Sequence, residues 1–293
     1  MRSIILGTDW WDDCDDAVAL RVICQAVKRG DVRLLGICIN ACMQYSVSSL
    51  KGFLTAEGMA DIPVGIDLCA TDFDGSPSYQ KRLSNNFAPN LTNNNAEEAV
   101  RLYRRLLSSA DDKVEIIEIG FLHVVADLLK SGADDISDKN GIELFKEKVA
   151  KVWVMAGKWD ADGERENNFC RNMRASIGAN AFCELCPVPV TFLGFEIGYG
   201  VITGQNLEKC DHLHEALLDH GSPNGRHSWD PMLVSMAIIG DEDQAGYNTV
   251  TGTAFVDPDT GADCFVESCD GLHRFVVKKY ANAFYEDQIN AVL

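Results

Sequence analysis

The chain has 293 residues, of which 46% are hydrophobic and 24% are charged, and its formal net charge is −18. This length suits one large α/β domain, and the apolar content provides a substantial core and excludes a disordered chain. The 26 lysines and arginines occur in scattered ones and twos, so no basic face is available to neutralise many phosphates. We therefore expect one domain spanning residues 1–293 and no nucleic acid partner.

Targeting and redox features indicate a cytoplasmic protein. The N-terminal segment holds too short an apolar run for a secretory signal, and no apolar run approaches the roughly 18 residues of a membrane span. The 11 cysteines are odd in number, and several, including Cys24 and Cys38, lie inside apolar runs, as buried free thiols do. Cys183 and Cys186 have C-x-x-C spacing, but neither a second pair nor a nearby histidine completes a zinc site. We expect a reduced compartment and no membrane partner.

Apolar runs that predict buried strands alternate with stretches that predict helices. The expected strands are 3–6, 34–39, 114–119, 149–155 and 188–193. The expected helices between them are 15–27, 47–59, 96–107, 123–129, 142–149 and 174–184. A late helix ending at 239 is followed by strands at 249–256, 263–268 and 273–277 and by a closing helix from 279. This order predicts an α/β fold with a mainly parallel sheet flanked by helices on both faces. Ligands of such sheets bind at the carboxyl ends of the strands, where long polar loops at 67–95 and 158–171 are expected.

The strongest chemical signal lies between the first expected strand and the first expected helix. Residues 9–16 contain five aspartates, a density that is costly without a counter-charge. Helix capping and the helix dipole account for one or two of them. A hard cation such as calcium, which prefers carboxylate and carbonyl oxygens, accounts for the others. A solvated acidic turn and a phosphatase-type aspartate nucleophile are the alternatives. An EF-hand is disfavoured because the segment lacks its central glycine and its terminal glutamate.

The same segment resembles the opening signature of the nucleoside hydrolase family (inosine/uridine-preferring type). That signature is a strand ending in Asp, a short turn containing Gly, and Asp-Asp-Ala leading into a helix. Asp9 and residues 15–17 match it. The turn is two residues longer than in the commonest form and carries Trp10 and Trp11 in place of an apolar-Gly pair. The resemblance implies a divergent member of the family with its Rossmann-like fold.

Three later segments resemble the family's motifs in the same order. Residues 119–126 resemble its Gly-Pro-Leu-Thr-Asn-x-Ala turn, with His123 at the threonine position. Residues 154–157 and 166–169 resemble the Met-Gly-Gly loop and the Glu-x-Asn-x element that holds the sugar. Residues 228–231 resemble its His-Asp-Pro motif, with tryptophan in place of the histidine. The resemblance thus extends from about residue 3 to residue 239.

The resemblance implies hydrolysis of the N-glycosidic bond of a ribonucleoside to free base and ribose, using a calcium-bound water. Calcium would be held by Asp9, Asp16, Asp230 and the backbone carbonyl of His123, with Asp9 as the catalytic base. The residues expected to bind the substrate are Asp15, Asn40, Glu166, Asn168, Trp229 and Asp230. The resemblance also implies a homo-oligomer, either a dimer or a tetramer.

The departing base also requires help, and Trp229 stands where the family has a histidine acid. His227 lies two residues away and is the nearest substitute, although an exposed loop histidine is the simpler interpretation. Trp10, Trp11, Trp159 and Trp229 are either base-stacking residues or core and rim aromatics. Two alternatives therefore stay open: a non-catalytic nucleoside- or ribose-binding relative, and a hydrolase of another ribosyl conjugate.

Overall fold

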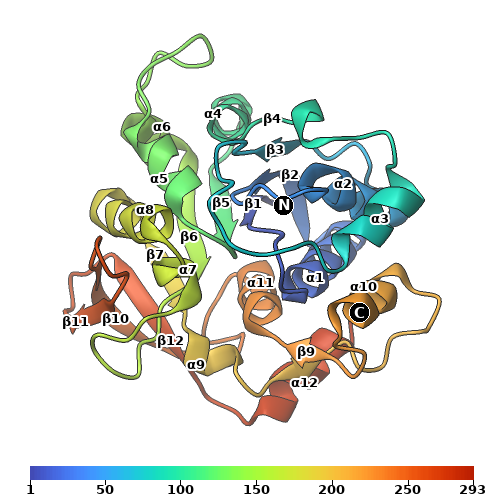
Figure 1. Ribbon diagram of the computed structural model, residues 1–293. Coiled ribbons are helices and arrows are strands. Elements are labelled where there is room, and N and C mark those ends of the chain that lie inside the picture. The colour runs from blue at the N-terminus through green and yellow to red at the C-terminus, as the bar shows by residue number, and fades with distance from the viewer.

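A ten-stranded sheet runs through the centre of the computed structural model, which describes residues 1–293 (Figure 1). Its strand order is β11-β10-β12-β7-β6-β5-β1-β2-β3-β4. The strands of this sheet are β1 (Arg2–Thr8), β2 (Val32–Ile39), β3 (Val64–Ile66), β4 (Glu97–Glu98), β5 (Val114–Glu118), β6 (Val149–Met155), β7 (Val190–Leu193), β10 (Tyr247–Val256), β11 (Asp263–Glu267) and β12 (His273–Lys278). A separate antiparallel pair consists of β8 (Ile202–Thr203) and β9 (Arg226–His227).

Helices cover both faces of the sheet, as the sequence pattern predicts. They are α1 (Asp15–Arg29), α2 (Ser46–Ala56), α3 (Gln80–Phe87), α4 (Ala99–Ser109), α5 (His123–Lys130), α6 (Gly141–Lys148), α7 (Asn167–Cys170), α8 (Met173–Leu185), α9 (Phe195–Gly198), α10 (His212–His220), α11 (Trp229–Ile239) and α12 (Asn282–Asn290), with a 3₁₀ turn at Asn93–Asn95. In Figure 1, α4, α5, α6 and α8 lie on one side of the sheet, and α1, α2 and α11 lie on the other. No helix is long and apolar enough to cross a membrane.

The order of the strands places a topological switch at β1. Strands β1 to β7 and β12 all run in one direction, and β10 runs in the opposite direction between β11 and β12. The chain proceeds from β1 outward to β2, β3 and β4, and then returns to the opposite side of β1 as β5. A crevice forms outside the carboxyl ends of the strands at such a point, and open α/β sheets bind their ligands there.

The apolar run of β1 is continuous because both of its faces are buried. Ile4 and Leu6 belong to the core beneath α1, α2 and α11, whereas Ile5 belongs to the core beneath α4, α5 and α8. Successive side chains of a strand point to opposite faces, so a strand between two helical layers needs apolar residues at every position. This packing fixes the end of β1, and hence Asp9, against the interior.

Several helix and strand boundaries differ from the expected ones, and the cause of each difference is local. Strand β7 begins at Val190 and not at residue 188, because Pro189 has no N–H to donate to the sheet. Helix α4 begins at Ala99 because the Glu98 side chain accepts from the backbone N–H groups of Val100 and Arg101. The expected loops 67–95 and 158–171 contain α3 and α7, which the apolar pattern does not predict.

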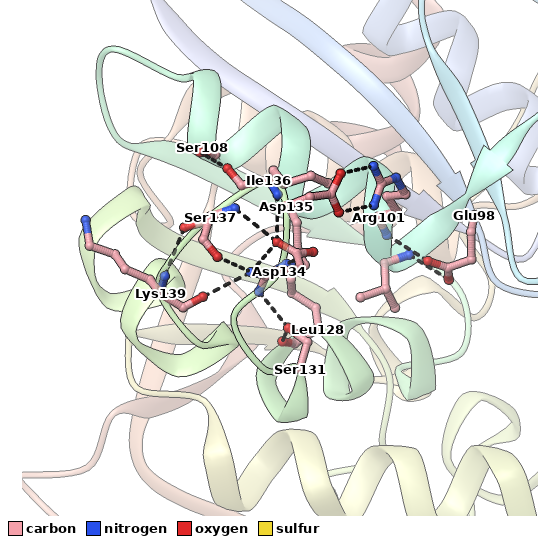
Figure 2. Close-up of polar contacts among 12 residues, drawn as sticks. Glu98, Arg101, Ser108, Leu128, Ser131, Asp134, Asp135, Ile136, Ser137 and Lys139 are labelled. Carbon is pink, nitrogen blue, oxygen red and sulfur yellow. Dashed lines mark hydrogen bonds and ion pairs between the residues drawn. The ribbon is translucent and has the colours of Figure 1, made fainter.

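Two arginines of α4 pair with aspartates in the loop between α5 and α6, and Figure 2 labels one of them, Arg101. Arg101 forms a bidentate pair with Asp135, at 2.7 and 2.6 Å. Arg104, which is 2% exposed, binds Asp134 at 2.8 and 2.9 Å. The Ser108 hydroxyl adds a 3.3 Å hydrogen bond to the carbonyl of Ile136. This network lies on the helical layer and is part of the scaffold.

Candidate active site

A cavity of about 290 Å³ opens at the carboxyl ends of β1, β5, β6 and β7. It therefore lies at the topological switch, where the fold predicts a ligand site. Its lining contains seven carboxyl side chains and two guanidinium groups. The lining residues are Asp9, Trp11, Asp12, Asp13, Asp15, Asp16, Ile119, Met155, Glu166, Asn167, Asn168, Arg171, Phe195, Arg226, Trp229 and Asp230.

Three aspartates form a compact group at the floor of this cavity. Asp15 and Asp16 occupy the first turn of α1, and Asp230 occupies the first turn of α11. One oxygen from each carboxylate lies within 4.8 Å of the other two. The backbone N–H of Asp230 donates to Asp15 at 3.2 Å, and the Thr8 hydroxyl donates to Asp16. Asp9 lines the same cavity, and the negative charges of Asp16 and Asp15 raise the pKa of Asp9.

Ionising these carboxyl groups in the absence of a cation is unfavourable. Burial raises the pKa of Asp9, Asp15 and Asp230 well above the usual range, and the neighbouring aspartates raise it further. Burial also raises the pKa of Asp16 to about 7, although donors from Thr8 and the Trp10 backbone oppose the shift. A bound cation would reverse this balance, because it stabilises the ionised form of every group around it.

The donor set fits a hard divalent cation. Every atom that Asp15, Asp16 and Asp230 offer is a carboxylate oxygen, and neither sulfur nor imidazole belongs to the group. Calcium takes six to eight oxygen ligands at about 2.3–2.6 Å, so ligands on opposite sides of one ion lie about 5 Å apart. Oxygens that lie within 4.8 Å of one another can therefore contact one such ion. The group includes Asp15, which the sequence assigned to the sugar.

Glu166 and Asn168 extend the cavity on the α7 side. The Glu166 carboxylate accepts from the backbone N–H groups of Asn168, at 2.9 and 3.0 Å, and of Gly157, at 3.1 Å. Burial raises the pKa of Glu166 to about 8 despite these donors. The Asn168 amide donates to the carbonyl of Met155 at 2.9 Å, which leaves its side-chain oxygen available to a ligand. Both side chains are therefore held in place before any substrate arrives.

Known proteins match this chain in structure but not in sequence. No family model and no curated protein matches its sequence. A plant nucleoside hydrolase is 16% identical with a TM-score of 0.71, over 99% of both chains. The inosine-uridine preferring nucleoside hydrolase from Bacillus anthracis is 14% identical with a TM-score of 0.64, over 100% of this chain and 99% of that one. The type III effector protein XopQ, solved with adenosine diphosphate ribose, is 15% identical with a TM-score of 0.68, over 99% of this chain and 93% of that one.

This chain has the nucleoside hydrolase fold. The fold expected from the sequence motifs is thereby confirmed, including the mainly parallel sheet with helices on both faces. At these identities the likeness concerns the fold alone, so the roles of individual residues depend on the geometry of the cavity.

Two expected site residues do not line the cavity of this nucleoside hydrolase fold. Asn40 accepts from the Phe121 backbone N–H at 3.0 Å, and its buried amide nitrogen has no acceptor. It lies beside Asp9, because a side chain at Gly120 would collide with both residues. The His123 ring points to Asp67, at 3.1 Å, and the residue that its segment contributes to the cavity is Ile119. The proposed ligation by the His123 carbonyl stays a prediction.

The tryptophans divide into core and cavity residues. Trp10 is fully buried and donates to Ser49 at 2.8 Å, and Trp159 is 9% exposed and donates to the carbonyl of Ala156 at 3.2 Å. These two rings belong to the core. Trp11 and Trp229 line the cavity. The face of Trp229 stacks on Phe195, with ring centroids 5.3 Å apart.

The sequence analysis did not identify three of the residues that line the cavity. One histidine that it named as a candidate acid lies outside the cavity lining. Arg171, Phe195 and Arg226 line the cavity, and the only signal for the two arginines is their position a few residues from Asn168 and Asp230. His227 does not line it. The His227 Nδ1 accepts from the Gly200 backbone at 2.9 Å, and its ring stacks on Tyr199 at 4.8 Å.

Proposed function

We propose that this chain is a divergent nucleoside hydrolase that cleaves the N-glycosidic bond of a ribonucleoside to free base and ribose. The observation that carries the proposal is the convergence of Asp9, Asp15, Asp16 and Asp230 with the sugar-binding pair Glu166 and Asn168 on one cavity. These residues come from three separate segments of the chain, 9–16, 166–168 and 230. The nucleoside hydrolases among the fold neighbours support this reaction class.

Calcium is the proposed cofactor, held by Asp9, Asp16, Asp230 and the carbonyl of His123, with Asp15 in contact with the same group. When bound, it would lower the pKa of a water molecule and bind the vicinal hydroxyls of ribose. Asp9 takes the proton of the attacking water. The water oxygen bonds to C1 of the sugar, the C1–N bond breaks, and the base leaves with the bonding electron pair and takes a proton from solvent water, because no histidine lines the cavity.

The sugar is held by side chains that surround this point. Asp15, Glu166 and Asn168 accept hydrogen bonds from ribose hydroxyls, whereas Asn40, which the sequence also assigned to the sugar, lies outside the cavity lining. Contacts near the 2-hydroxyl strengthen as the ring develops oxocarbenium character, and this stabilises the transition state. Trp229 and Phe195 offer a stacked aromatic surface to the leaving base.

A second candidate function is supported by the absence of an imidazole acid. No histidine lines the cavity, and Trp229 stands beside Asp230. A site that lacks this acid would bind a nucleoside without turnover, or would cleave a ribosyl conjugate whose leaving group departs without protonation. The complex of XopQ with adenosine diphosphate ribose supports a ribosyl conjugate as the second substrate class.

We also propose that residues 1–293 act as one domain in a cytoplasmic homo-oligomer, a dimer or a tetramer. One sheet takes strands from both ends of the chain, which supports the single domain. All 11 cysteines are free thiols, which supports a reducing compartment. Phe255, Val266 and Leu272 are exposed apolar residues at the β11 side of the sheet, which supports a contact between subunits.

Substitution of Asp9 tests the catalytic assignment. We expect Asp9→Asn to bind adenosine with a Kd near that of the wild type, because the amide preserves shape, while sugar release falls by about a thousandfold or more. Released reducing sugar and calorimetric binding are the two measurements. Asp31→Asn, at an exposed ion pair with Arg29, is the matched control and retains full turnover. Turnover by Asp9→Asn at the wild-type rate would exclude Asp9 as the base.

A further inference from the structure

We propose that the physiological substrate carries a phosphate or diphosphate group, which binds Arg171 and Arg226 at the mouth of the cavity. The substrate class is thus a nucleotide or a phosphorylated ribosyl conjugate, and a free nucleoside lacks part of what the site recognises. This inference rests on the proposed function, because it assumes that the ribose occupies the carboxylate floor. It adds to the proposed function the chemical class of the substituent that would lie at the mouth of the cavity.

The cavity is polarised from floor to mouth. Asp9, Asp15, Asp16 and Asp230 are between 3% and 7% exposed, and they form the floor. Arg171 is an exposed residue and Arg226 is half-buried, yet both line the same cavity. A ligand that fills it therefore meets oxygen acceptors at its inner end and guanidinium donors at its outer end. A ribosyl group with an attached phosphate has the matching order of chemistry.

Arg171 is held at the mouth with most of its donors free. Its guanidinium lies over the ring of Trp11, 4.4 Å from the centroid, and one nitrogen donates to the carbonyl of Asp74 at 2.8 Å. Its Nε and Nη1 have no acceptor in the protein. Stacking on an indole fixes the plane of a guanidinium and leaves its N–H edge available, which is the geometry that binds phosphate in a bidentate manner.

Arg226 is fixed in the same manner by a second indole and by a carboxylate. It forms a bidentate pair with Asp13, with Nε 2.9 Å and Nη2 2.5 Å from its oxygens, and it lies over the Trp229 ring, 5.5 Å from the centroid. Its Nη1 has no acceptor. The pair thus holds a charged guanidinium in place.

The net charge of the whole molecule bears on how an anionic substrate could bind near these two arginines. With a net charge of −18, the protein repels anions over most of its surface. An anionic substrate therefore needs local donors, and these two guanidinium groups are the only basic side chains in the cavity lining. Arg226 pairs with Asp13, so neutralising the acidic turn accounts for Arg226, but the same role would require Arg171 also to pair with a carboxylate. Its hydrogen bond goes instead to a backbone carbonyl.

The test compares three compounds that share one adenine–ribose bond: adenosine, adenosine 5′-monophosphate and adenosine diphosphate ribose. Adenine release by the calcium-loaded full chain gives kcat/KM for each. We expect at least one phosphorylated compound to exceed adenosine by about tenfold or more, the effect of one charge-assisted hydrogen bond. The kcat/KM values of adenosine 5′-monophosphate and adenosine diphosphate ribose show whether the site prefers a monophosphate or a diphosphate. A kcat/KM for adenosine equal to or above both would overturn the proposal.

Arginine variants link the preference to these residues. We expect Arg171→Gln to reduce the ratio of phosphorylated to unphosphorylated kcat/KM by about tenfold, and Arg226→Gln to do the same. Arg174→Gln is the matched control, because Arg174 anchors the same 69–74 loop without lining the cavity, and it keeps the wild-type ratio. An unchanged ratio in both Arg171→Gln and Arg226→Gln would contradict the assignment.

Kinetic constants of the wild type, together with Kd values of the three compounds for the Asp9→Asn variant, separate failure of this inference from failure of the proposed function. If adenosine is hydrolysed but is preferred, only the inference fails. If none of the compounds is hydrolysed, the proposed hydrolysis fails, and calorimetric Kd values then decide the inference. Tighter binding of adenosine 5′-monophosphate or adenosine diphosphate ribose than of adenosine supports it. Equal or weaker binding, or no binding of any compound, overturns it.

Discussion

At the scale of single residues, burial governs the chemistry of the acidic floor. Asp15, Asp16 and Asp230 each offer an oxygen within 4.8 Å of the other two, and burial raises the pKa of each. An isolated carboxylate in such a place tends to remain protonated, whereas a carboxylate beside a divalent cation is ionised. Backbone and hydroxyl donors from Asp230 and Thr8 orient the oxygens without supplying a compensating full charge. The arrangement is therefore suited to a cation.

Removal of Asp230 tests the metal group directly. We expect Asp230→Ala to lose stoichiometric calcium, because it deletes one carboxylate from the group and the remaining ligands are too few to replace water around the ion. The measurement is metal content after gel filtration, with calorimetric titration of calcium. Asp241→Ala, on the turn after α11, serves as the control and keeps its calcium. Retention of one tightly bound ion by Asp230→Ala would exclude the proposed shell.

The proposed stacking of the leaving base on Trp229 can be tested separately. We expect Trp229→Ala to raise KM for a purine substrate by about tenfold, because a base that stacks on an aromatic ring gains about 1–3 kcal/mol. Tyr199→Ala is the control, since Tyr199 stacks on Phe195 from outside and does not line the cavity. Steady-state kinetics with both variants provide the measurement. Equal KM values for Trp229→Ala and the wild type would mean that the base binds elsewhere.

At the scale of elements, the carboxyl ends of the strands bring distant segments together. The loop after β1, the residues after β5 and the end of β6 supply Asp9, Ile119 and Met155 to one cavity. Helices α1 and α11 pack together and bring Asp15 and Asp230 into contact. The C-terminal strands of the sheet have a structural role. Strand β12 pairs with β7 and β10, and residues of β10 belong to the core beneath α4, α5 and α8.

A histidine in that tail predicts acid sensitivity. His273 of β12 is 3% exposed, and its Nδ1 accepts from the Ala254 backbone N–H at 3.0 Å. Burial lowers its pKa to about 4, below the ordinary value near 6.5. Its contribution to stability is therefore present above pH about 6.5 and is lost as the pH falls toward about 4. We expect His273→Asn, which keeps an acceptor, to flatten this part of the profile of melting temperature against pH. Parallel profiles for the variant and the wild type would contradict this account.

The sequence predicts the long elements of the sheet because burial on both faces requires unbroken apolar runs, as in residues 3–6. It also predicts that Asp9 and Asp230 belong to one site, through the resemblance of their motifs. It does not predict α7 or α9, each a single turn without periodicity. Trp10 and Trp11 are adjacent and identical, yet only the second lines the cavity, and no local pattern separates them.

At the scale of the whole molecule, the fold concentrates charge of both signs at one edge of the sheet. The acidic floor and the two arginines lie at the carboxyl ends of the strands, where the order of the strands reverses at β1. The fold neighbours share this architecture at 14–16% identity, so the layered sheet persists while most side chains differ. Function must therefore be argued from the cavity and not from the fold alone.

The most direct test of the central claim is calcium-dependent release of sugar from nucleosides and their phosphorylated forms. Purified, calcium-loaded protein is incubated with purine and pyrimidine ribonucleosides and with their 5′-monophosphates, and reducing sugar is measured with and without a chelator. The account predicts release from at least one compound and its loss on chelation, with recovery when calcium is restored. Release that is unaffected by chelation, or no release from any compound by protein with confirmed bound calcium, would contradict it.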